Sequence, residues 1–252
     1  MEVVNVPCTS AGIHISEEHP DLEYRRVSFP AGDTIVRGVL ASPKGAEPRP
    51  AVIVIHENRG LTEHIRDVAR RTALEGYVAL GVDLMSPLGG SDSFPTRDDA
   101  IANIRNVTPQ QVLQQLDASV DFLRSQPNVR ADRIGVVGFC WGGGASLLFA
   151  THRPDLAAAV SFYGRSPDPL DNVQNIRAQV MCVYGEDDPG LMPGVPALEE
   201  ALQRHGKAHE ILVYAGAKHA FHNDDNHERW HAQAARSAWA RTVLFFQRHL
   251  GA

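Results

Sequence analysis

Cysteine is scarce in this sequence, and basic residues are not in excess. The 252 residues include three cysteines, an odd and sparse set that fits neither a disulfide framework nor a CxxC metal knuckle. Lys and Arg number 24 against 30 Asp and Glu, which gives a formal net charge of −6. This balance excludes the broad basic surface that nucleic-acid binding needs. We therefore expect no nucleic-acid partner.

Long apolar runs are also missing. No stretch approaches the roughly 18 consecutive apolar residues of a membrane-spanning helix, so we expect no membrane partner. The first residues lack the basic patch and apolar run of a secretory signal. A cytoplasmic location is the resulting expectation, although a signal that had already been removed would leave the same sequence.

The chain does contain enough apolar material for one sizeable core. Hydrophobic residues make up 43% of it and charged residues 21%, and α/β domains of this length are commonly single. No repeat or low-complexity segment divides the sequence. We expect an N-terminal extension over residues 1–21 and one domain over residues 22–252.

Short apolar runs alternate with longer amphipathic segments along most of the chain. Two β-rich segments, 22–29 and 34–40, are joined by a turn and predict a hairpin. Further strands are predicted over 51–56, 77–82, 134–138, 157–162, 180–184 and 210–214, and helices over 63–75, 109–125, 143–151, 195–205 and 228–250. This alternation predicts an α/β fold with a mainly parallel central sheet and helices on both faces. The irregular segment 85–106 is interpreted as a lid, a substrate loop or a plain surface loop.

The most informative segment is Gly138–Gly142, which reads Gly-Phe-Cys-Trp-Gly and leads from a buried strand toward a helix. Such a turn is so tight that its central residue is strained, and the flanking glycines avoid collisions with neighbouring elements. The turn lifts the Cys140 side chain above the sheet, beside a helix N-terminus that favours a thiolate. Cys140 is therefore the predicted nucleophile, with a passive cysteine in a glycine-rich turn as the alternative. Cys182 lies in an apolar run and is predicted to be a small buried hydrophobe.

An acid and a histidine follow in the chain order that hydrolases with such a turn use. Glu186, Asp187 and Asp188 come directly after a predicted strand, and His219 lies in the loop after the last strand. Both positions fall at the carboxyl ends of strands, where α/β sheets place their chemistry. The pattern predicts a catalytic triad in which His219 is the base and Asp188 orients it.

These residues resemble the dienelactone hydrolase family, whose members use a cysteine in place of the usual serine. The similarity covers about residues 22–250, and its anchors are His56–Gly60, Asp83, Gly138–Gly143, Gly185–Gly190 and Lys218–Asp224. The resemblance implies an α/β-hydrolase fold and hydrolysis of a small-molecule ester or lactone through a thioester acyl-enzyme, without a cofactor. The family's Gly-x-x-Asp pattern puts the triad acid at Asp188, with Asp187 and Glu186 as rivals.

The resemblance also implies roles for the residues around the nucleophile. Glu57 matches a family glutamate that interacts with the neutral resting thiol until substrate binding frees the thiol to ionise toward the histidine. A plain ion pair between Glu57 and Arg59 is the alternative. The backbone N–H groups of Trp141 and Asn58 are the expected oxyanion donors.

The substrate contacts depart from the family pattern. Founding members bind a carboxylate with an arginine after the fourth strand and with a serine and an arginine after the histidine. Here Pro87, Ala220 and Asn223 stand at those places. The candidate replacements and pocket residues are Arg59, Arg97 and the aromatic Phe221. The reaction class follows from the triad, whereas the physiological ester does not.

Other functions each fit a single feature of the sequence. A general carboxylesterase or thioesterase would share the chemistry, and a hydrolase-fold binding protein without turnover would have lost a catalytic residue that is intact here. His227 and His231 would share one helix face, as zinc ligands can, but no second ligand cluster accompanies them, so we expect no metal. Peroxide reduction needs a resolving cysteine, and Cys182 is predicted to be buried. The sequence predicts no oligomeric state.

Overall fold

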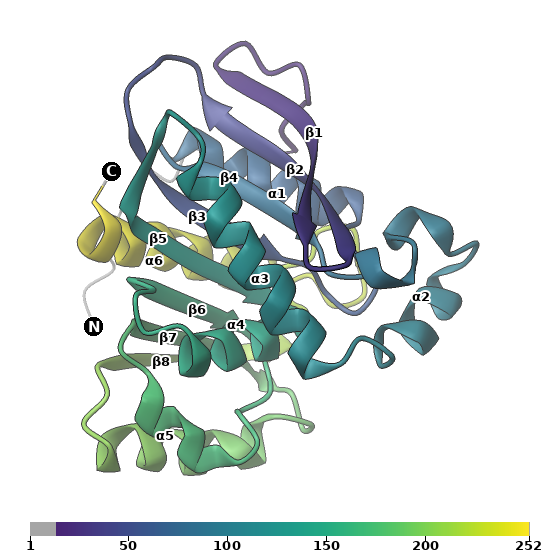
Figure 1. The fold of residues 1–252 in the computed structure, drawn as a ribbon. Coiled ribbons are helices and arrows are strands. Elements are labelled where there is room, and N and C mark those ends of the chain that lie inside the picture. The colour runs from purple at the N-terminus through teal and green to yellow at the C-terminus, as the bar shows by residue number, and fades with distance from the viewer. Residues whose placement is uncertain (1–13, 252) are drawn as a thin grey trace.

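One sheet of eight strands organises residues 14–251, the part of the chain that this computed structural model describes (Figure 1). The strand order is β1-β2-β4-β3-β5-β6-β7-β8. β1 pairs with β2 and β2 with β4 in antiparallel fashion, and the remaining pairs are parallel. The strands are β1 (Leu22–Ala31), β2 (Thr34–Pro43), β3 (Arg49–Ile55), β4 (Val78–Asp83), β5 (Val129–Phe139), β6 (Ala158–Phe162), β7 (Gln179–Asp187) and β8 (His209–Lys218). The predicted α/β class with a mainly parallel sheet is confirmed.

Helices cover both faces of the sheet. They are α1 (Glu63–Leu74), α2 (Arg97–Ile104), α3 (Pro109–Arg124), α4 (Trp141–His152), α5 (Val195–Arg204) and α6 (Ala232–Leu250). In Figure 1, α3, α4 and α5 lie in front of the sheet and α6 lies behind it. Each face buries its own apolar cluster: Leu116 and Phe149 belong to the front one, Val68 and Trp239 to the rear one. The strands between the two clusters are buried on both sides, as β-branched runs predict.

Local chemistry sets where α3 begins. Thr108 precedes the helix and forms a capping box with Gln111, so that side chains satisfy backbone donors at the first turn. Pro109 occupies the first helical position, where a missing N–H costs nothing. Val112 and Leu116 then face the sheet. This start matters because Val107, Pro109 and Val112 line the cavity described below.

Several elements differ from the sequence prediction, among them α4, α6 and the segment 85–106. α4 begins at Trp141, directly after the strained turn, and not at residue 143. α6 begins at Ala232, and not at residue 228, because residues 223–231 form successive hydrogen-bonded turns before His231 caps the helix through Nδ1. The segment 85–106 contains α2, whose first turn is capped by the Thr96 side chain, together with short 3₁₀ turns at Ser86–Leu88 and Ser91–Ser93.

The described end of the N-terminal extension packs against the sheet edge and α1. Ile15 is buried in a small cluster with Leu22, Ala41 and Ala73. Its N–H donates to Asp67 at 2.7 Å, and its carbonyl oxygen accepts from Arg70 at 2.6 Å. The domain boundary at residue 22 stays a prediction. Cys8 lies outside the described residues.

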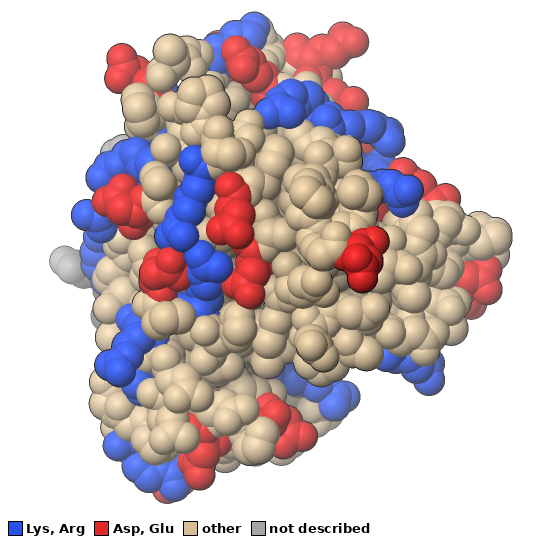
Figure 2. Space-filling view, in the orientation of Figure 1, with Lys and Arg blue, Asp and Glu red and all other residues tan. Residues whose placement is uncertain are grey.

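The face over α3, α4 and α5 carries both signs of charge. Figure 2 shows Lys and Arg side chains interspersed with Asp and Glu around a broad central area that carries neither. Arg153, for example, lies between Asp117 and Asp155, at 2.9 and 2.6 Å. Among residues 14–251, no helix is long and apolar enough to cross a membrane.

Candidate active site

The turn between β5 and α4 holds Cys140 in a strained conformation. Its φ is 56° and its ψ is −115°, a region that residues with a side chain rarely adopt. The flanking glycines are required by contact: a Cβ on Gly138 would lie 1.9 Å from the carbonyl oxygen of Gly142, and a Cβ on Gly142 would lie 2.3 Å from that of His56. β5 therefore passes into α4 without a loop, and the thiol stands at the helix N-terminus.

His219 lies between Cys140 and Asp188. Its Nε2 is 3.1 Å from the Cys140 sulfur, and its Nδ1 is 2.6 Å from Asp188 Oδ2. Because an ionised carboxylate can only accept, the ring proton sits on Nδ1 and donates to Asp188. Nε2 is then free to accept a proton from the thiol. The geometry thus brings the three residues of the predicted triad together, with His219 between Cys140 and Asp188.

Asp188 is the acid that faces the histidine, whereas its two rivals point outward. Asp188 is 4% exposed at the end of β7, and its other oxygen accepts from the Gly190 N–H at 3.1 Å. Asp187 and Glu186 are exposed, and Glu186 accepts from the Gly216 N–H instead.

The Cys140 thiol is neutral in this resting arrangement. Burial and, next, the negative charge of Glu57 raise its pKa to about 11. The backbone N–H groups of Trp141 and Asn58 lower this pKa and so oppose the rise. Both groups that the sequence predicts as oxyanion donors therefore act on the Cys140 thiol. The helix N-terminus that the sequence suggested would favour a thiolate is outweighed by desolvation.

Glu57 is buried directly after β3, and its charge acts on the thiol. One carboxylate oxygen accepts from Asn223 Nδ2 at 2.5 Å, while the other has no hydrogen-bond partner within the described chain. The thiol itself is hydrogen-bonded to His219. Sequence reasoning missed the part of Asn223, which it treated only as the replacement for a substrate-binding arginine. Nothing local could have revealed a contact between residues 166 positions apart.

A cavity of about 570 Å³ opens at Cys140. Cys140, His219 and Asn58 all line it. Its apolar wall comes from the start of α3, from α4 and from the loop after β7, and includes Val107, Val112, Trp141, Ala145, Leu148 and Leu191. Arg165, Ser166 and Asp168 add a polar side. This is the form of a small-molecule site, apolar with a few convergent polar groups.

The candidate substrate contacts lie in different places. Phe221 is fully buried, with ring centroids 5.6 Å from both Tyr163 and Tyr214, and does not line the cavity, so we assign it to core packing. Arg59 is half-buried beside the site, where burial and the nearby charge of Arg97 lower its pKa. It also stays outside the cavity wall. Arg165, which the sequence did not single out, is the arginine that lines the cavity.

The histidine-rich stretch does not form the two-histidine helix face that the sequence suggested. His227 lies in a turn and His231 precedes α6, so the two side chains do not share a helix. The Nδ1 of His231 accepts the Ala234 N–H. Within residues 14–251, no group of three or more His, Cys, Asp and Glu side chains is arranged to hold a metal ion.

The sheet order, the strained turn between strand and helix, and the later acid and histidine define the α/β-hydrolase class. Residues 36–250 match the profile of the dienelactone hydrolase family. The chain belongs to this family, and it is a dienelactone hydrolase-like hydrolase of lactones or esters.

Relatives from several organisms agree with this assignment. A protein of Escherichia coli (strain K12), provisionally named carboxymethylenebutenolidase, is 35% identical over 236 residues, which are 89% of this chain and 86% of that protein. A Bradyrhizobium protein, provisionally named a 2-oxo-3-(5-oxofuran-2-ylidene)propanoate lactonase, is 35% identical over 84% of this chain and 88% of its own. A crystal structure from Klebsiella pneumoniae subsp. pneumoniae MGH 78578, provisionally described as a dienelactone hydrolase, has a TM-score of 0.84 and 32% identity, and covers 90% of this chain and 99% of its own.

Proposed function

We propose that this protein hydrolyses lactones or activated esters with Cys140 as nucleophile, His219 as base and Asp188 as the acid that orients the base. The observation that carries the proposal is the unbroken chain of contacts from the sulfur to Nε2 and from Nδ1 to the buried carboxylate. A histidine held in this tautomer can accept only at the atom that faces the thiol.

The chemistry then runs in two halves. His219 takes the thiol proton as the sulfur attacks the acyl carbon, and the N–H groups of Trp141 and Asn58 stabilise the oxyanion. His219 returns the proton to the departing enolate or alkoxide, which leaves a thioester on Cys140. Water, deprotonated by His219, then attacks the thioester, and the carboxylic acid and the free thiol are released.

The neutral thiol suits a hydrolase that ionises its nucleophile only when substrate is bound. With a pKa of about 11, few resting molecules carry a thiolate at neutral pH. Burial and, next, the charge of Glu57 maintain this state. A substrate that displaces water and brings its carbonyl to the two N–H groups gives the developing negative charge a place to reside.

The substrate class follows from the leaving group and the cavity wall. A thiolate leaves a tetrahedral intermediate more readily than an alkoxide does, so enol lactones and aryl esters should react well and simple alkyl esters slowly. The cavity is mostly apolar, with Arg165 available to an anionic group. The lactonase name of the Bradyrhizobium relative is consistent with this class. General carboxylesterase or thioesterase activity is the second candidate, favoured by the same apolar wall.

The test compares initial rates on dienelactone and p-nitrophenyl acetate for the unaltered protein, for Cys140→Ala and for Cys182→Ala as a matched control. Cys182 is fully buried in β7, outside the cavity wall. We expect Cys140→Ala to lose turnover on both esters and Cys182→Ala to retain it. Acid quench during turnover should leave the acyl mass on the Cys140 peptide. Full activity in Cys140→Ala would remove the cysteine mechanism, and binding of both esters without turnover in the unaltered protein would favour a non-catalytic binding protein.

A further inference from the structure

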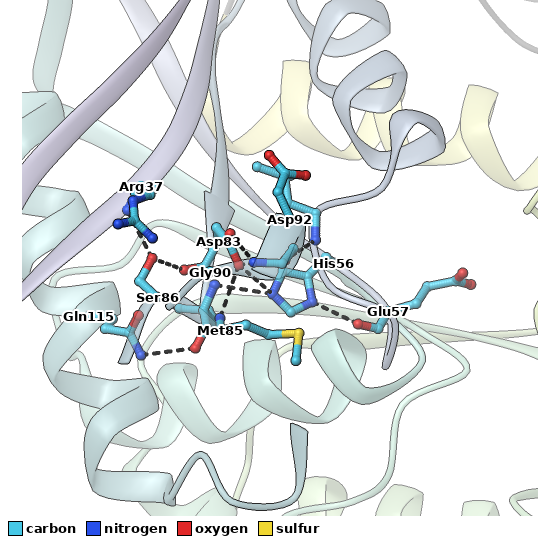
Figure 3. A network of polar contacts seen from close by, with 12 residues as sticks. Arg37, His56, Glu57, Asp83, Met85, Ser86, Gly90, Asp92 and Gln115 are labelled. Carbon is cyan, nitrogen blue, oxygen red and sulfur yellow. Dashed lines mark hydrogen bonds and ion pairs between the residues drawn. The ribbon is translucent and has the colours of Figure 1, made fainter. Parts of the chain in front are cut away.

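His56 lies fully buried behind the loop that carries Glu57 and Asn58, and both of its ring nitrogens are hydrogen-bonded. Nε2 is 3.1 Å from the Leu84 backbone nitrogen, and Nδ1 is 2.7 Å from the Glu57 carbonyl oxygen. Figure 3 shows the ring between the Glu57 carbonyl on one side and the loop that begins at Asp83 on the other. Neither the proposed mechanism nor the family assignment gives this histidine a task.

The partners of His56 determine its tautomer. A backbone N–H can only donate, so Nε2 must accept from Leu84. Burial lowers the pKa of His56, which keeps the ring neutral. The single ring proton is therefore on Nδ1 and donates to the Glu57 carbonyl oxygen. The contact between Leu84 and Nε2 thus decides which hydrogen bond His56 makes on its other side.

The Glu57 carbonyl belongs to the same peptide unit as the Asn58 N–H. The atoms of a peptide unit lie close to one plane, with C=O and N–H on opposite sides. A hydrogen bond to the oxygen therefore also sets the direction of the N–H. That N–H lowers the pKa of the Cys140 thiol, and Asn58 and Cys140 line the same cavity, so the His56 bond fixes the direction of one of the two N–H groups that act on the sulfur.

The scaffold behind His56 is itself held at several points. Gln115 Nε2 donates to the Leu84 carbonyl at 3.2 Å, which ties residue Leu84 to α3. Asp83 accepts from the Ser91 N–H at 2.7 Å and from its hydroxyl at 2.6 Å. The Ser91 hydroxyl in turn accepts from the Leu61 N–H at 2.8 Å. The loop from residue 57 to residue 61 is therefore anchored at both ends to the loop from residue 83 to residue 91.

Trp141 completes the arrangement. Its ring stacks on the His56 ring with a centroid distance of 5.5 Å and an interplanar angle of 9°. The backbone N–H of the same residue is the second one that lowers the pKa of the thiol. The His56 side chain thus contacts Trp141, which supplies one N–H group, and fixes the Glu57–Asn58 peptide, which supplies the other.

We propose that His56 is a positioning residue that orients the Glu57–Asn58 peptide. The Asn58 N–H then points at the oxyanion that forms when the Cys140 sulfur attacks the substrate carbonyl. The inference rests on the proposed function, because it assumes attack at this site. It adds a requirement that the nucleophile, base and acid do not impose: a neutral His56 protonated on Nδ1.

A matched pair of substitutions separates the two ring nitrogens. In His56→Asn, the amide nitrogen lies close to the position of Nδ1 and can donate to the Glu57 carbonyl. In His56→Gln, the amide oxygen lies close to the position of Nε2 and can accept from Leu84, but the donor to Glu57 is lost. Each variant loses one buried hydrogen bond and the imidazole ring, so their stabilities should be similar.

We expect His56→Asn to keep kcat within about threefold and His56→Gln to lose about 10- to 100-fold, because displacing an oxyanion donor costs somewhat less than the roughly 10²- to 10³-fold of deleting one. KM should change little in either variant. The rate of Cys140 alkylation by iodoacetamide across pH provides a readout that needs no turnover. Loss of the Asn58 donor should move its midpoint upward in His56→Gln and not in His56→Asn.

If kcat falls equally in the two variants, in proportion to their melting temperatures, the role of His56 is purely structural and the proposal is overturned. An unchanged kcat in His56→Gln would also overturn it. If His56→Gln does not fold, Gln115→Met serves instead, because it removes the hydrogen bond from Gln115 that holds Leu84, the partner of His56. It should lower kcat by about two- to fivefold with the same upward alkylation shift, and no change in either quantity would contradict the proposal. Failure of the cysteine mechanism is distinguishable, because it would appear as full activity in Cys140→Ala whatever the His56 variants do.

Discussion

The resting thiol is expected to become more reactive when the charge of Glu57 is removed. Glu57→Gln keeps the shape of the side chain and an oxygen that can accept from Asn223. It deletes the negative charge that, after burial, contributes most to raising the pKa of Cys140. The pKa of the thiol should therefore fall, although burial keeps it above that of a free cysteine.

The size of the effect follows from the thiolate population. With a pKa of about 11, about one molecule in a thousand carries a thiolate at pH 8. One nearby charge at a partly buried site shifts a pKa by about one unit, or ~1.4 kcal/mol. Each unit multiplies the thiolate population at fixed pH by about ten. We therefore expect Cys140 to be alkylated about tenfold faster in Glu57→Gln at pH 8.

The assay is alkylation by iodoacetamide without substrate, followed by mass spectrometry of the Cys140 peptide so that Cys8 and Cys182 do not contribute. Glu199→Gln is the matched control, because it makes the same change in net charge at an exposed position on α5. It should react like the unaltered protein. Unchanged or slower alkylation in Glu57→Gln would refute the electrostatic account of the protected thiol.

Three further outcomes are expected. Asp188→Asn should lower kcat on p-nitrophenyl acetate by roughly 10³- to 10⁴-fold, because an amide no longer holds the proton of the base on Nδ1; a loss below tenfold would contradict this. Gly138→Ala should cost about 3 kcal/mol or more in urea unfolding, because its Cβ would lie 1.9 Å from a backbone oxygen, whereas Gly194→Ala, with nothing within 4 Å, should cost almost nothing. Burial lowers the pKa of His222 well below 6.5, so the unfolded chain binds its proton first and stability falls as pH drops below about 6.5. His222→Phe should therefore reduce this loss between pH 6.5 and 5 by up to ~1.4 kcal/mol per pH unit, and an identical slope in both proteins would show that His222 does not titrate on unfolding.

The fold class could be predicted because its signals are local and repeated. Runs such as residues 51–56 are mostly β-branched and buried on both faces, and the amphipathic segments between them have the helical period. Boundaries were less certain where local hydrogen bonds compete with a helix. Residues 223–231 form turns in place of a first helical turn, and α2 appears where Pro and Gly suggested only irregular chain.

The meeting of Cys140, Asp188 and His219 could be anticipated because each of them follows a strand at the same edge of the sheet. Contacts that depend on side chains meeting across the fold could not. The bond between Asn223 and Glu57 joins distant segments, and the cavity wall at Leu148 and Arg165 depends on how α4 packs beside the loop after β6. Phe221 illustrates the converse, because it lies two residues after His219 while its ring belongs to the core.

The hydrogen bonds between the loops 57–61 and 83–91 separate two parts of the segment 83–106 that should respond differently to mutations aimed at substrate preference. Its first part, up to Ser91, supports the Asn58 peptide through Asp83 and Leu84, so randomising it would cost turnover before it changed selectivity. Val107, Leu148 and Ser166 line the cavity and take no part in the hydrogen bonds that join Cys140, His219 and Asp188 or in those of this support. Mutant libraries for activity on new esters should therefore vary the cavity-wall residues and leave the segment from Asp83 to Ser91 unchanged.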